Sequence, residues 1–351
     1  MSRRPTIADI AEAAGVSKGA VSYALNGRPG VSKATREKIL AIATEMGFVP
    51  NRAARSLSVA SAQAVGIALR RSARTLGIEP FFMELISGIE VALSAESYGL
   101  TLQIVGSLEE ELEVYRRWWG ERRVDGVLLC DVGVDDRRLE WVADLGLPAV
   151  AIGGPVENTS VPTVWNDQSE PCREALDYLF ALGHRRIGRV GGMPRLLHTA
   201  VRDEAFDSAS VALNFKSVTT IHGDFTGEQG ARITRRLLTL PERPTAIVYD
   251  NDVMAIAGLG VAHELGFELP RDLSIVSWDD SPLCRLTHPA LTALSRDIHG
   301  HGSTAAEILL RIITAGSTAV DPAALSVQCP QSHLTPRAST GSAPESVSAG
   351  S

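Results

Sequence analysis

The residues from 17 to 26 have the types and spacing that DNA recognition needs. The residues after Ser17 are expected to form a helix with Val21 and Leu25 facing inward. Its outer face then carries Lys18, Gly19, Ser22, Tyr23 and Asn26. Polar side chains of these kinds hydrogen-bond to base edges and phosphate oxygens in a major groove. This face is therefore a candidate DNA-reading surface.

A second helix must hold this one at a fixed angle, and the preceding residues predict it. Thr6 is placed to cap a helix, and Asp9, three residues on, is placed to return a hydrogen bond as in a capping box. Gly15 can adopt the positive φ of a tight turn, and Ser17 would cap the reading helix. The apolar face of the first helix consists of Ile7, Ile10, Ala11 and Ala14. The spacing is that of a helix-turn-helix, although an ordinary helical hairpin with a solvated outer face shares it.

A third helix and the distribution of charge favour DNA binding. Residues 32–47 predict a helix capped by Ser32 and ended by Gly47. Its expected inward residues are Ile39, Leu40, Ile42, Ala43 and Met46. Residues 1–59 carry nine Lys and Arg against four Asp and Glu, a net charge of +5, whereas the whole chain carries −7 and the remainder therefore −12. A basic head on an acidic body indicates a polyanionic partner at one end of the chain.

The rest of the 351-residue chain predicts an α/β body. Near-continuous apolar runs alternate with helical stretches, which is typical of parallel sheets covered on both faces. The alternation occurs in two series, so we expect two doubly wound subdomains facing a cleft. The expected strands are 64–69, 100–105, 126–130, 149–152, 186–190, 218–222, 246–249, 273–277 and 291–295, and the expected helices include 82–98, 170–183, 227–239, 252–266 and 302–314.

Polar residues follow many of these strands, where the ligands of doubly wound sheets bind. These strand-end residues are Asp131, Asn166, Asp167, Asp224, Phe225, Asp250, Asn251, Asp252, Asp279 and Asp280. Arg202 would lie just after the strand that ends near Val190. Carboxylates, one guanidinium and aromatic rings are suited to a polyhydroxylated ligand. Any single aspartate, Asp252 among them, has the alternative role of a turn or helix cap.

The sequence carries no pattern for catalysis, for a metal or for a membrane. It has no phosphate-binding glycine-rich loop, no G-x-S-x-G motif, no apolar signal segment and no run approaching eighteen apolar residues. His299 and His301 favour a loop at a helix start over a metal site. Four cysteines without paired spacing are expected to be buried reduced thiols: Cys130, Cys172, Cys284 and Cys329. We therefore expect a cytoplasmic protein that is not an enzyme and needs no cofactor or metal.

Three motifs near the amino terminus together form a specific signature. They are T-I-A-D-I-A-E-A-A-G-V-S-x-x-x-V-S-x-x-L-N-G from Thr6, V-S-x-x-T-R from Val31, and G-F-V-P-N-x-x-A-R-S-L from Gly47. They closely resemble the LacI/GalR family of bacterial transcription regulators, and the similarity extends more loosely to about residue 337. It implies a helix-turn-helix head, a periplasmic-binding-protein-like body, and a repressor that binds a palindromic operator in double-stranded DNA as a homodimer.

The resemblance also implies DNA-contacting residues. Bases would be read from Lys18, Gly19 and Tyr23, and further contacts would come from Thr6, Ser17, Ser22, Asn26, Ser32, Thr35 and Asn51. Many members have a hydrogen-bonding side chain where this chain has Gly19 and an arginine where it has Tyr23, so the operator sequence is open. Gly19 permits close approach of the backbone to DNA, or is a tolerated surface glycine. Tyr23 cannot make the bidentate arginine–guanine contact.

Residues 50–57 resemble the family's hinge helix. Eight residues are too few for a stable isolated helix, so this segment is expected to order only beside its dimer mate on DNA. Ala54 would let two such helices approach, and Leu57 would wedge between base steps in the minor groove. A plain linker is the alternative.

The resemblance places a small-molecule effector in the body. Arg202 matches the family's ligand-binding arginine, and Asp279 matches an acidic residue beside which Trp278 is expected to narrow or reshape the pocket. The other matching residues are Phe81 or Phe82, Phe225, Asn251, Asp252 and, more weakly, Asp167. A sugar or sugar-like metabolite is the expected effector. By changing the angle between the subdomains it would act as inducer or as corepressor.

The expected organisation is a head at 1–47, a hinge and linker at 48–60, a body at 61–337 and a disordered low-complexity tail at 338–351. The amino-terminal subdomain would comprise about 61–163 and 293–320, and the carboxy-terminal subdomain about 164–292 and 321–337. The dimer interface is expected near 82–91 and the strand that follows. The rival hypothesis is a non-catalytic sugar-binding protein, or an enzyme, with an unrelated basic head.

Overall fold

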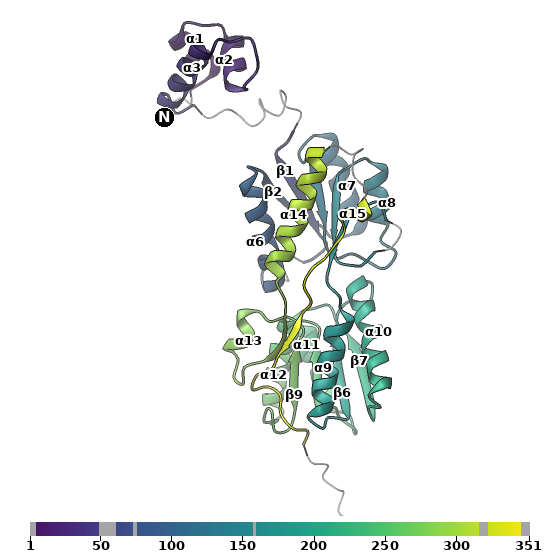
Figure 1. Ribbon diagram of the computed structural model, residues 1–351. Helices are drawn as coiled ribbons and strands as arrows, with labels where there is room; N and C mark the ends of the chain where they lie inside the picture. The colour runs from purple at the N-terminus through teal and green to yellow at the C-terminus, as the bar shows by residue number, and fades with distance from the viewer. Residues whose placement is uncertain (1–4, 49–60, 73–75, 157–158, 316–321, 345–351) are drawn as a thin grey trace, which may run out of the picture. The chain divides into compact units, whose positions relative to one another are not determined.

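The chain folds into two units, a small helical head and a larger α/β body (Figure 1). The computed structural model describes residues 5–48, 61–72, 76–156, 159–315 and 322–344, and the division between the units falls after Gln63. The head consists of α1 (Ile7–Ala14), α2 (Lys18–Leu25) and α3 (Lys33–Glu45). In the part of the chain thus described, a helix that could cross a membrane is not found.

Each helix of the head begins at the predicted hydroxyl side chain. Thr6, Ser17 and Ser32 each accept a hydrogen bond from the backbone N–H three residues on. Asp9 completes a capping box because its carboxylate accepts the backbone N–H of Thr6 at 2.7 Å. Gly15 turns the chain at a φ of 72°, in the left-handed region that favours glycine. These local signals fix where the three helices start and stop.

The head has a small core, and two residues predicted to lie in it do not. The buried residues are Ile10, Ala11, Ala14, Val21, Ala24, Ile39 and Ala43. Leu40 and Met46 are instead 42% and 37% exposed, so the prediction that they face inward is wrong. Successive helical residues are turned by about 100°, and Leu40 therefore points away from the stripe that Ile39 and Ala43 share.

The first subdomain of the body is a six-stranded, all-parallel sheet in the order β11-β5-β4-β3-β1-β2. Its strands are β1 (Ala64–Leu69), β2 (Gly99–Ile104), β3 (Gly126–Leu129), β4 (Ala149–Ile152), β5 (Thr163–Trp165) and β11 (Val327–Gln328). Its helices are α6 (Pro80–Ala95), α7 (Leu108–Gly120), α8 (Arg137–Asp144), α14 (Ile298–Ala315) and α15 (Pro322–Leu325). One core cluster lies under α6 and α14 and another under α7 and α8, so both faces are covered.

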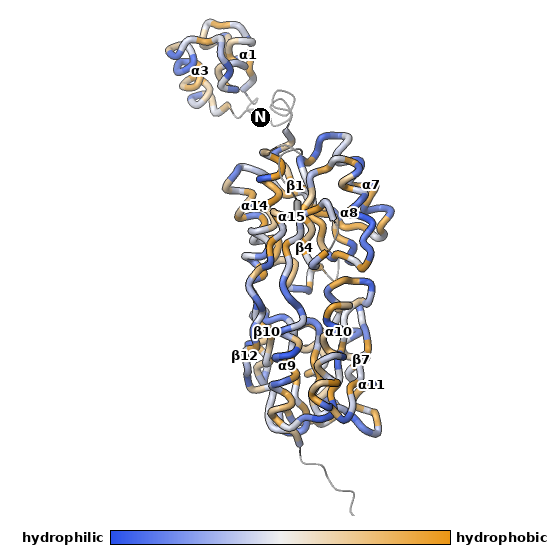
Figure 2. Tube along the Cα trace, turned by 45° about the vertical axis from the view of Figure 1, so that its right-hand side comes forward, coloured by the Kyte–Doolittle hydropathy of each residue, from blue (hydrophilic) through white to orange (hydrophobic). Residues whose placement is uncertain are grey.

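The second subdomain repeats this plan, with strand order β12-β10-β9-β8-β6-β7. Its strands are β6 (Arg186–Gly191), β7 (Ser217–His222), β8 (Ala246–Tyr249), β9 (Ser274–Ser277), β10 (Thr292–Ser295) and β12 (His333–Thr335), of which β12 is antiparallel to β10. Its helices are α9 (Ser169–Ala181), α10 (Leu197–Ala212), α11 (Gly227–Leu238), α12 (Asp252–Glu264) and α13 (Pro282–Leu286). Figure 2 shows hydrophobic residues gathered inside each half of the body. The expected α/β architecture is confirmed.

Two glycines bring α6 and α14 into backbone contact. A Cβ on Gly88 would lie 1.9 Å from the carbonyl oxygen of His299, and one on Gly302 would lie 2.3 Å from that of Leu85. Any side chain at either position would force the helices apart. The middle of α6 and the first turns of α14 are thereby held against each other.

The chain crosses between the subdomains three times, from β5 to α9, from β10 to α14 and from β11 to β12. The expected boundaries after 163 and after 292 each cut through a strand. All of β5 belongs to the first sheet, and all of β10 belongs to the second. The assignment of 321–337 to one subdomain is wrong, because β11 pairs with β5 and β12 with β10. Strands of two or three residues give no periodicity to detect.

The residues after 337 are in part ordered, contrary to the prediction for this segment. Ser339 is buried; its backbone N–H donates to the carbonyl of Ala290, and its carbonyl accepts from the N–H of Ile275. The backbone N–H of Ala343 donates to the carbonyl of Leu182. Low complexity describes side chains, whereas these bonds use the backbone. Residues 338–344 therefore form a strap on the second subdomain, and 345–351 lie outside the described residues.

The strap predicts a stability difference between two truncations. A chain ending at Arg337 should lose roughly 2–4 kcal/mol of unfolding free energy, because several buried hydrogen bonds to β9 and β10 are removed. A chain ending at Pro344 keeps those bonds and should unfold like the full chain. Urea unfolding followed by circular dichroism measures both, and equal midpoints would contradict the strap.

Candidate functional site

The outer face of α2 presents the predicted base-reading residues together. Lys18, Gly19 and Tyr23 are exposed, whereas Ser22 and Asn26 are half-buried and linked by a bond of 2.9 Å from Asn26 Nδ2 to the Ser22 carbonyl. These five residues form one continuous surface of the head.

The other predicted contacts of the head lie at helix starts. The Ser32 and Thr35 hydroxyls are 2.8 Å apart, and Ser17 caps α2 itself. Thr6 is engaged by Asp9 at the start of α1. The hinge residues Asn51, Ala54 and Leu57 lie outside the described residues.

Among residues 5–48 of the head, nothing requires glycine at position 19. A Cβ there would meet only the Ser17 hydroxyl, at an ordinary 3.7 Å, and the backbone is an α-helix. Since glycine costs roughly 1 kcal/mol of helix stability relative to alanine, the fold gains nothing from it. The interpretation of Gly19 as a point of close approach to DNA therefore depends on what lies outside the head.

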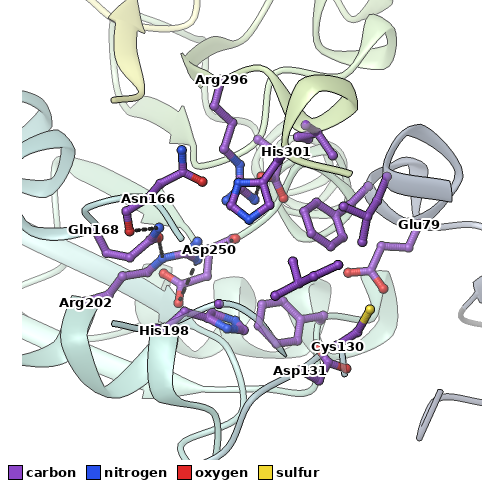
Figure 3. A pocket seen from close by; sticks show the side chains of 18 of the residues that line it. Glu79, Cys130, Asp131, Asn166, Gln168, His198, Arg202, Asp250, Arg296 and His301 are labelled. Carbon is purple, nitrogen blue, oxygen red and sulfur yellow. Dashed lines mark hydrogen bonds and ion pairs between the residues drawn. The ribbon is translucent and has the colours of Figure 1, made fainter. Parts of the chain in front are cut away.

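The body contains a pocket between the two subdomains, with about 800 Å³ of free space including its open mouth. It is lined by residues that follow strands of both sheets and by the first turns of neighbouring helices (Figure 3). The lining residues are Arg71, Glu79, Phe81, Leu85, Cys130, Asp131, Ile152, Gly153, Gly154, Asn166, Gln168, His198, Arg202, Phe225, Asp250, Asp279, Arg296, Ile298 and His301. Apolar and aromatic walls with a few convergent polar groups are typical of small-molecule sites.

Arg202 is held rigidly on the second subdomain. Its Nε donates to Gln168 Oε1 at 2.9 Å, and its Nη1 donates to the carbonyl oxygen of Asp250 at 3.1 Å. Its guanidinium carbon lies 4.0 Å from the ring centre of Trp278. Burial lowers the pKa of Arg202 to about 10, so it stays charged at neutral pH. Trp278 stacks behind this arginine and is not part of the lining, which corrects the expectation that it narrows the pocket.

Asp250 is the buried counter-charge beneath Arg202. Burial alone would raise the pKa of Asp250, but Arg189 and then Arg202 outweigh it and hold the pKa at about 2. Arg189 donates to both carboxylate oxygens at 2.9 Å, and the backbone N–H of Gly192 donates to Oδ2 at the same distance. The carboxylate is thus ionised and satisfied without a ligand.

Arg71 links the two subdomains at the pocket. It binds Asp131 of the first subdomain at 3.0 and 3.1 Å, and its guanidinium lies 5.1 Å from the ring centre of Phe225 of the second. Asp131 and Phe225 both have left-handed backbones, with φ of 52° and 69°, which non-glycine residues rarely adopt and which is frequent at functional sites. The backbone N–H of Leu197 also donates across the gap, to the carbonyl of Val132 at 2.9 Å.

Two histidines of the pocket are uncharged. Burial holds the pKa of His198 well below its usual value, and burial lowers the pKa of His301 to about 4. His301 Nε2 lies 3.0 Å from the carbonyl oxygen of Val164, so this nitrogen carries the ring proton. In the described residues no group of side chains could hold a metal ion, and the four cysteines are buried free thiols.

The structure brings four of the eight predicted effector residues to the pocket: Phe81, Arg202, Phe225 and Asp279. Phe82 is buried behind Phe81, edge to face at 5.2 Å. The other three serve helix starts. Asn251 caps α12, Asp252 accepts the backbone N–H of Val253, and Asp167 accepts that of Ser169. For these three the turn-or-cap alternative describes the observed contacts.

Several lining residues were not predicted. Arg71 and Arg296 follow β1 and β10, so the strand-end rule applied to basic residues would find them. Glu79, Gln168, His198 and His301 lie before or within helices, and their direction depends on packing that the sequence does not display.

Comparison with known proteins gives consistent matches for both units. Residues 6–51 match the family model of bacterial regulatory proteins of the lacI family, and residues 176–340 match the periplasmic binding protein-like domain. The HTH-type transcriptional regulator CelR of Thermobifida fusca is 32% identical over 320 residues, which is 90% of this chain and 94% of that protein. The chain belongs to the LacI family. It is thus a DNA-binding transcription regulator with an effector-binding body, and not an enzyme.

Solved structures of LacI-family proteins agree with this fold. The transcriptional regulator CelR in complex with cellobiose is 29% identical with a TM-score of 0.71, covering 96% of this chain and all of its own. The lac repressor dimer bound to operator and the anti-inducer ONPF has a TM-score of 0.83 at 22% identity, covering 97% of this chain and 100% of its own, and shows the shared fold.

Proposed function

We propose that this LacI-family chain is a dimeric repressor of a palindromic operator, controlled by an uncharged carbohydrate in the pocket of its body. The observation that carries the carbohydrate assignment is the pairing of charges in that pocket. Arg71 binds Asp131, Arg296 binds Asp279 at 2.7 Å, and Arg202 lies against Asp250. Each guanidinium in the described lining already faces a carboxylate, so a phosphate or carboxylate on the ligand would lack a free cation.

The rest of the lining suits a polyol. Phe81 and Phe225 supply ring faces, while Asn166, Gln168 and Asp279 supply amide and carboxylate groups. Sugars are bound by such a combination of aromatic faces and directed hydrogen bonds. The cellobiose complex of the related regulator CelR supports the same ligand class.

A dimer is supported by the head and by an exposed apolar surface. A single helix-turn-helix head covers only a half-site, so a palindrome needs two. On α6 and the edge strand β2, Met83, Val91, Leu102 and Ile104 are exposed, and we name these four the α6–β2 face. This face lies where the sequence predicts the dimer interface. A dimer would supply two hinge segments, and the family resemblance implies that Leu57 of each enters the minor groove.

The test is binding to DNA from upstream of the chain's own gene, measured by fluorescence anisotropy between 50 and 200 mM salt. We expect a steep loss of affinity with salt, because lysine and arginine release counterions from phosphates. Neutral mono- and disaccharides, cellobiose first, should change the affinity, and the sign of that change separates inducer from corepressor. No binding to any such fragment at low salt would refute the proposal.

A further inference from the structure

Glu79 is a buried carboxyl group that does not cap the helix it precedes. It is the residue before Pro80, at the N-cap position of α6, yet its side chain makes no capping hydrogen bond. It is only 5% exposed, and it lines the pocket, into which its carboxyl group points (Figure 3). Among the described residues, its Oε2 has no hydrogen-bond partner. A buried polar atom without a hydrogen-bond partner needs an explanation, and a bound water or ligand is one.

The surroundings of Glu79 disfavour its charged form. Burial is the main cause that raises the pKa of Glu79 to about 8, and the nearby carboxylates of Asp131 and Asp279 add to the rise. The charge of Arg71 and a hydrogen bond with Asn251 act in the opposite direction and lower it. These groups follow β1, β3, β9 and β8, so charge faces Glu79 from both subdomains. Arg71 offsets this rise in the pKa of Glu79 only in part, because two of its nitrogens already bind Asp131. At neutral pH the side chain is therefore mostly an uncharged acid, able to donate one hydrogen bond and accept others.

Arg71 has hydrogen-bond donor capacity to spare beside this group. Within the described part of the chain, its Nη1 hydrogen-bonds to the thioether sulfur of Met193 alone, at 3.8 Å, and thioether sulfur is a weak acceptor. An oxygen placed between Arg71 and Glu79 could accept from the guanidinium while exchanging hydrogen bonds with the acid. A hydroxyl group matches both requirements, whereas an anionic oxygen would be repelled by Asp131 and Asp279.

We propose that Glu79 and Arg71 form a hydroxyl-binding subsite on the first subdomain, with Glu79 as the residue that selects an uncharged hydroxyl. This rests on the proposed function, since the ligand is the carbohydrate effector. Arg202 holds the same ligand from the second subdomain, so a bound sugar joins both halves of the body. Glu79 immediately precedes α6, the helix that carries Met83 and Val91 of the α6–β2 face. The subsite is thus connected directly to the surface at which two chains would pair.

The first test uses cellobiose and D-glucose as probes, with D-glucuronate as the charged comparison, measured by calorimetry on the full chain. Glu79→Ala should weaken binding of the neutral sugar about tenfold to a hundredfold, because the hydroxyl loses its partner. Glu79→Gln, which stays uncharged, should remain within about threefold at pH 7. Wild-type affinity should fall above pH 8 by up to about tenfold per pH unit, while Glu79→Gln stays flat. Glu90→Gln, an exposed change on the same helix, is the control.

Wild-type affinity in Glu79→Ala, or an unchanged pH profile in Glu79→Gln, would overturn the subsite. If the wild-type chain binds D-glucuronate and neither neutral sugar, the proposed function fails instead, and the second test still decides the state of Glu79.

The second test needs no ligand. Because the pKa of folded Glu79 lies above the ordinary value, the stability linked to its proton is complete below about pH 4.5 and is lost as pH rises through about 8. The melting temperature of Glu79→Gln relative to wild type should therefore increase from pH 5 to about pH 8 and level off above it. A constant difference over that range would overturn the subsite, whatever the sugars do.

Discussion

Replacing Arg202 with methionine should abolish the response to the neutral sugar while leaving operator affinity in its absence within about twofold. Arg202 is positioned through Nε and Nη1, so we expect its Nη2 to be the group that donates to the ligand. Truncating one partner of a buried, charge-assisted hydrogen bond costs about 2–5 kcal/mol, which corresponds to a loss of roughly thirtyfold to several thousandfold in affinity. Calorimetry with the sugar and anisotropy with the operator measure the two effects separately.

Methionine is chosen because it keeps the fold. Its length preserves packing against Trp278, and Asp250 retains both hydrogen bonds from Arg189. Arg189→Met is the contrasting variant, since it removes the main partner of a buried carboxylate and should lower the unfolding free energy by about 3–5 kcal/mol. Sugar binding and induction that persist in Arg202→Met would exclude this pocket as the effector site.

Replacing Val91 with arginine should convert the dimer into monomers and lower operator affinity about a hundredfold or more. Val91 is 58% exposed on α6 and belongs to the α6–β2 face. A guanidinium buried at the centre of an apolar interface has no counter-charge, and each copy of a two-fold interface would carry the defect. A monomer engages one half-site, so the gain from tethering a second head is lost.

Val211→Arg supplies the matched control for this prediction. Val211 is 82% exposed on α10 of the second subdomain, outside the α6–β2 face. The same change there should leave sedimentation velocity and operator affinity as in wild type. A dimeric Val91→Arg with normal affinity would place the interface elsewhere.

The fold could be predicted largely because its signals are local. Hydroxyl caps and Gly15 define the head, and continuous apolar runs such as 246–249 define buried parallel strands. What escaped prediction is set by partners distant in sequence. β11 and β12 exist because β5 and β10 offer free edges, and Ser339 is buried because β9 and β10 leave backbone groups for it.

The residues of the pocket also fall into those that the sequence predicts and those that depend on tertiary contacts. Arg202 and Asp279 were found from the family's motif, and Phe225 from its place after a strand. Asn251, Asp252 and Asp167 satisfy the same rule, but their oxygens are used by helix N–H groups. Glu79 shows the converse, since a residue placed to cap a helix turns away from it. Which alternative a polar side chain takes is decided by competing hydrogen bonds, and those depend on the assembled tertiary structure.

The three crossings between the sheets also bear on how hybrid regulators can be built. A gene fusion joined anywhere between 166 and 326 would separate β5 from β11 or β10 from β12, so each half would inherit an incomplete sheet. Residues 64–344 must therefore be exchanged as one cassette. A new sensor specificity is best grafted behind a foreign reading head through a junction ahead of Ala64, rather than by recombining pieces of the body.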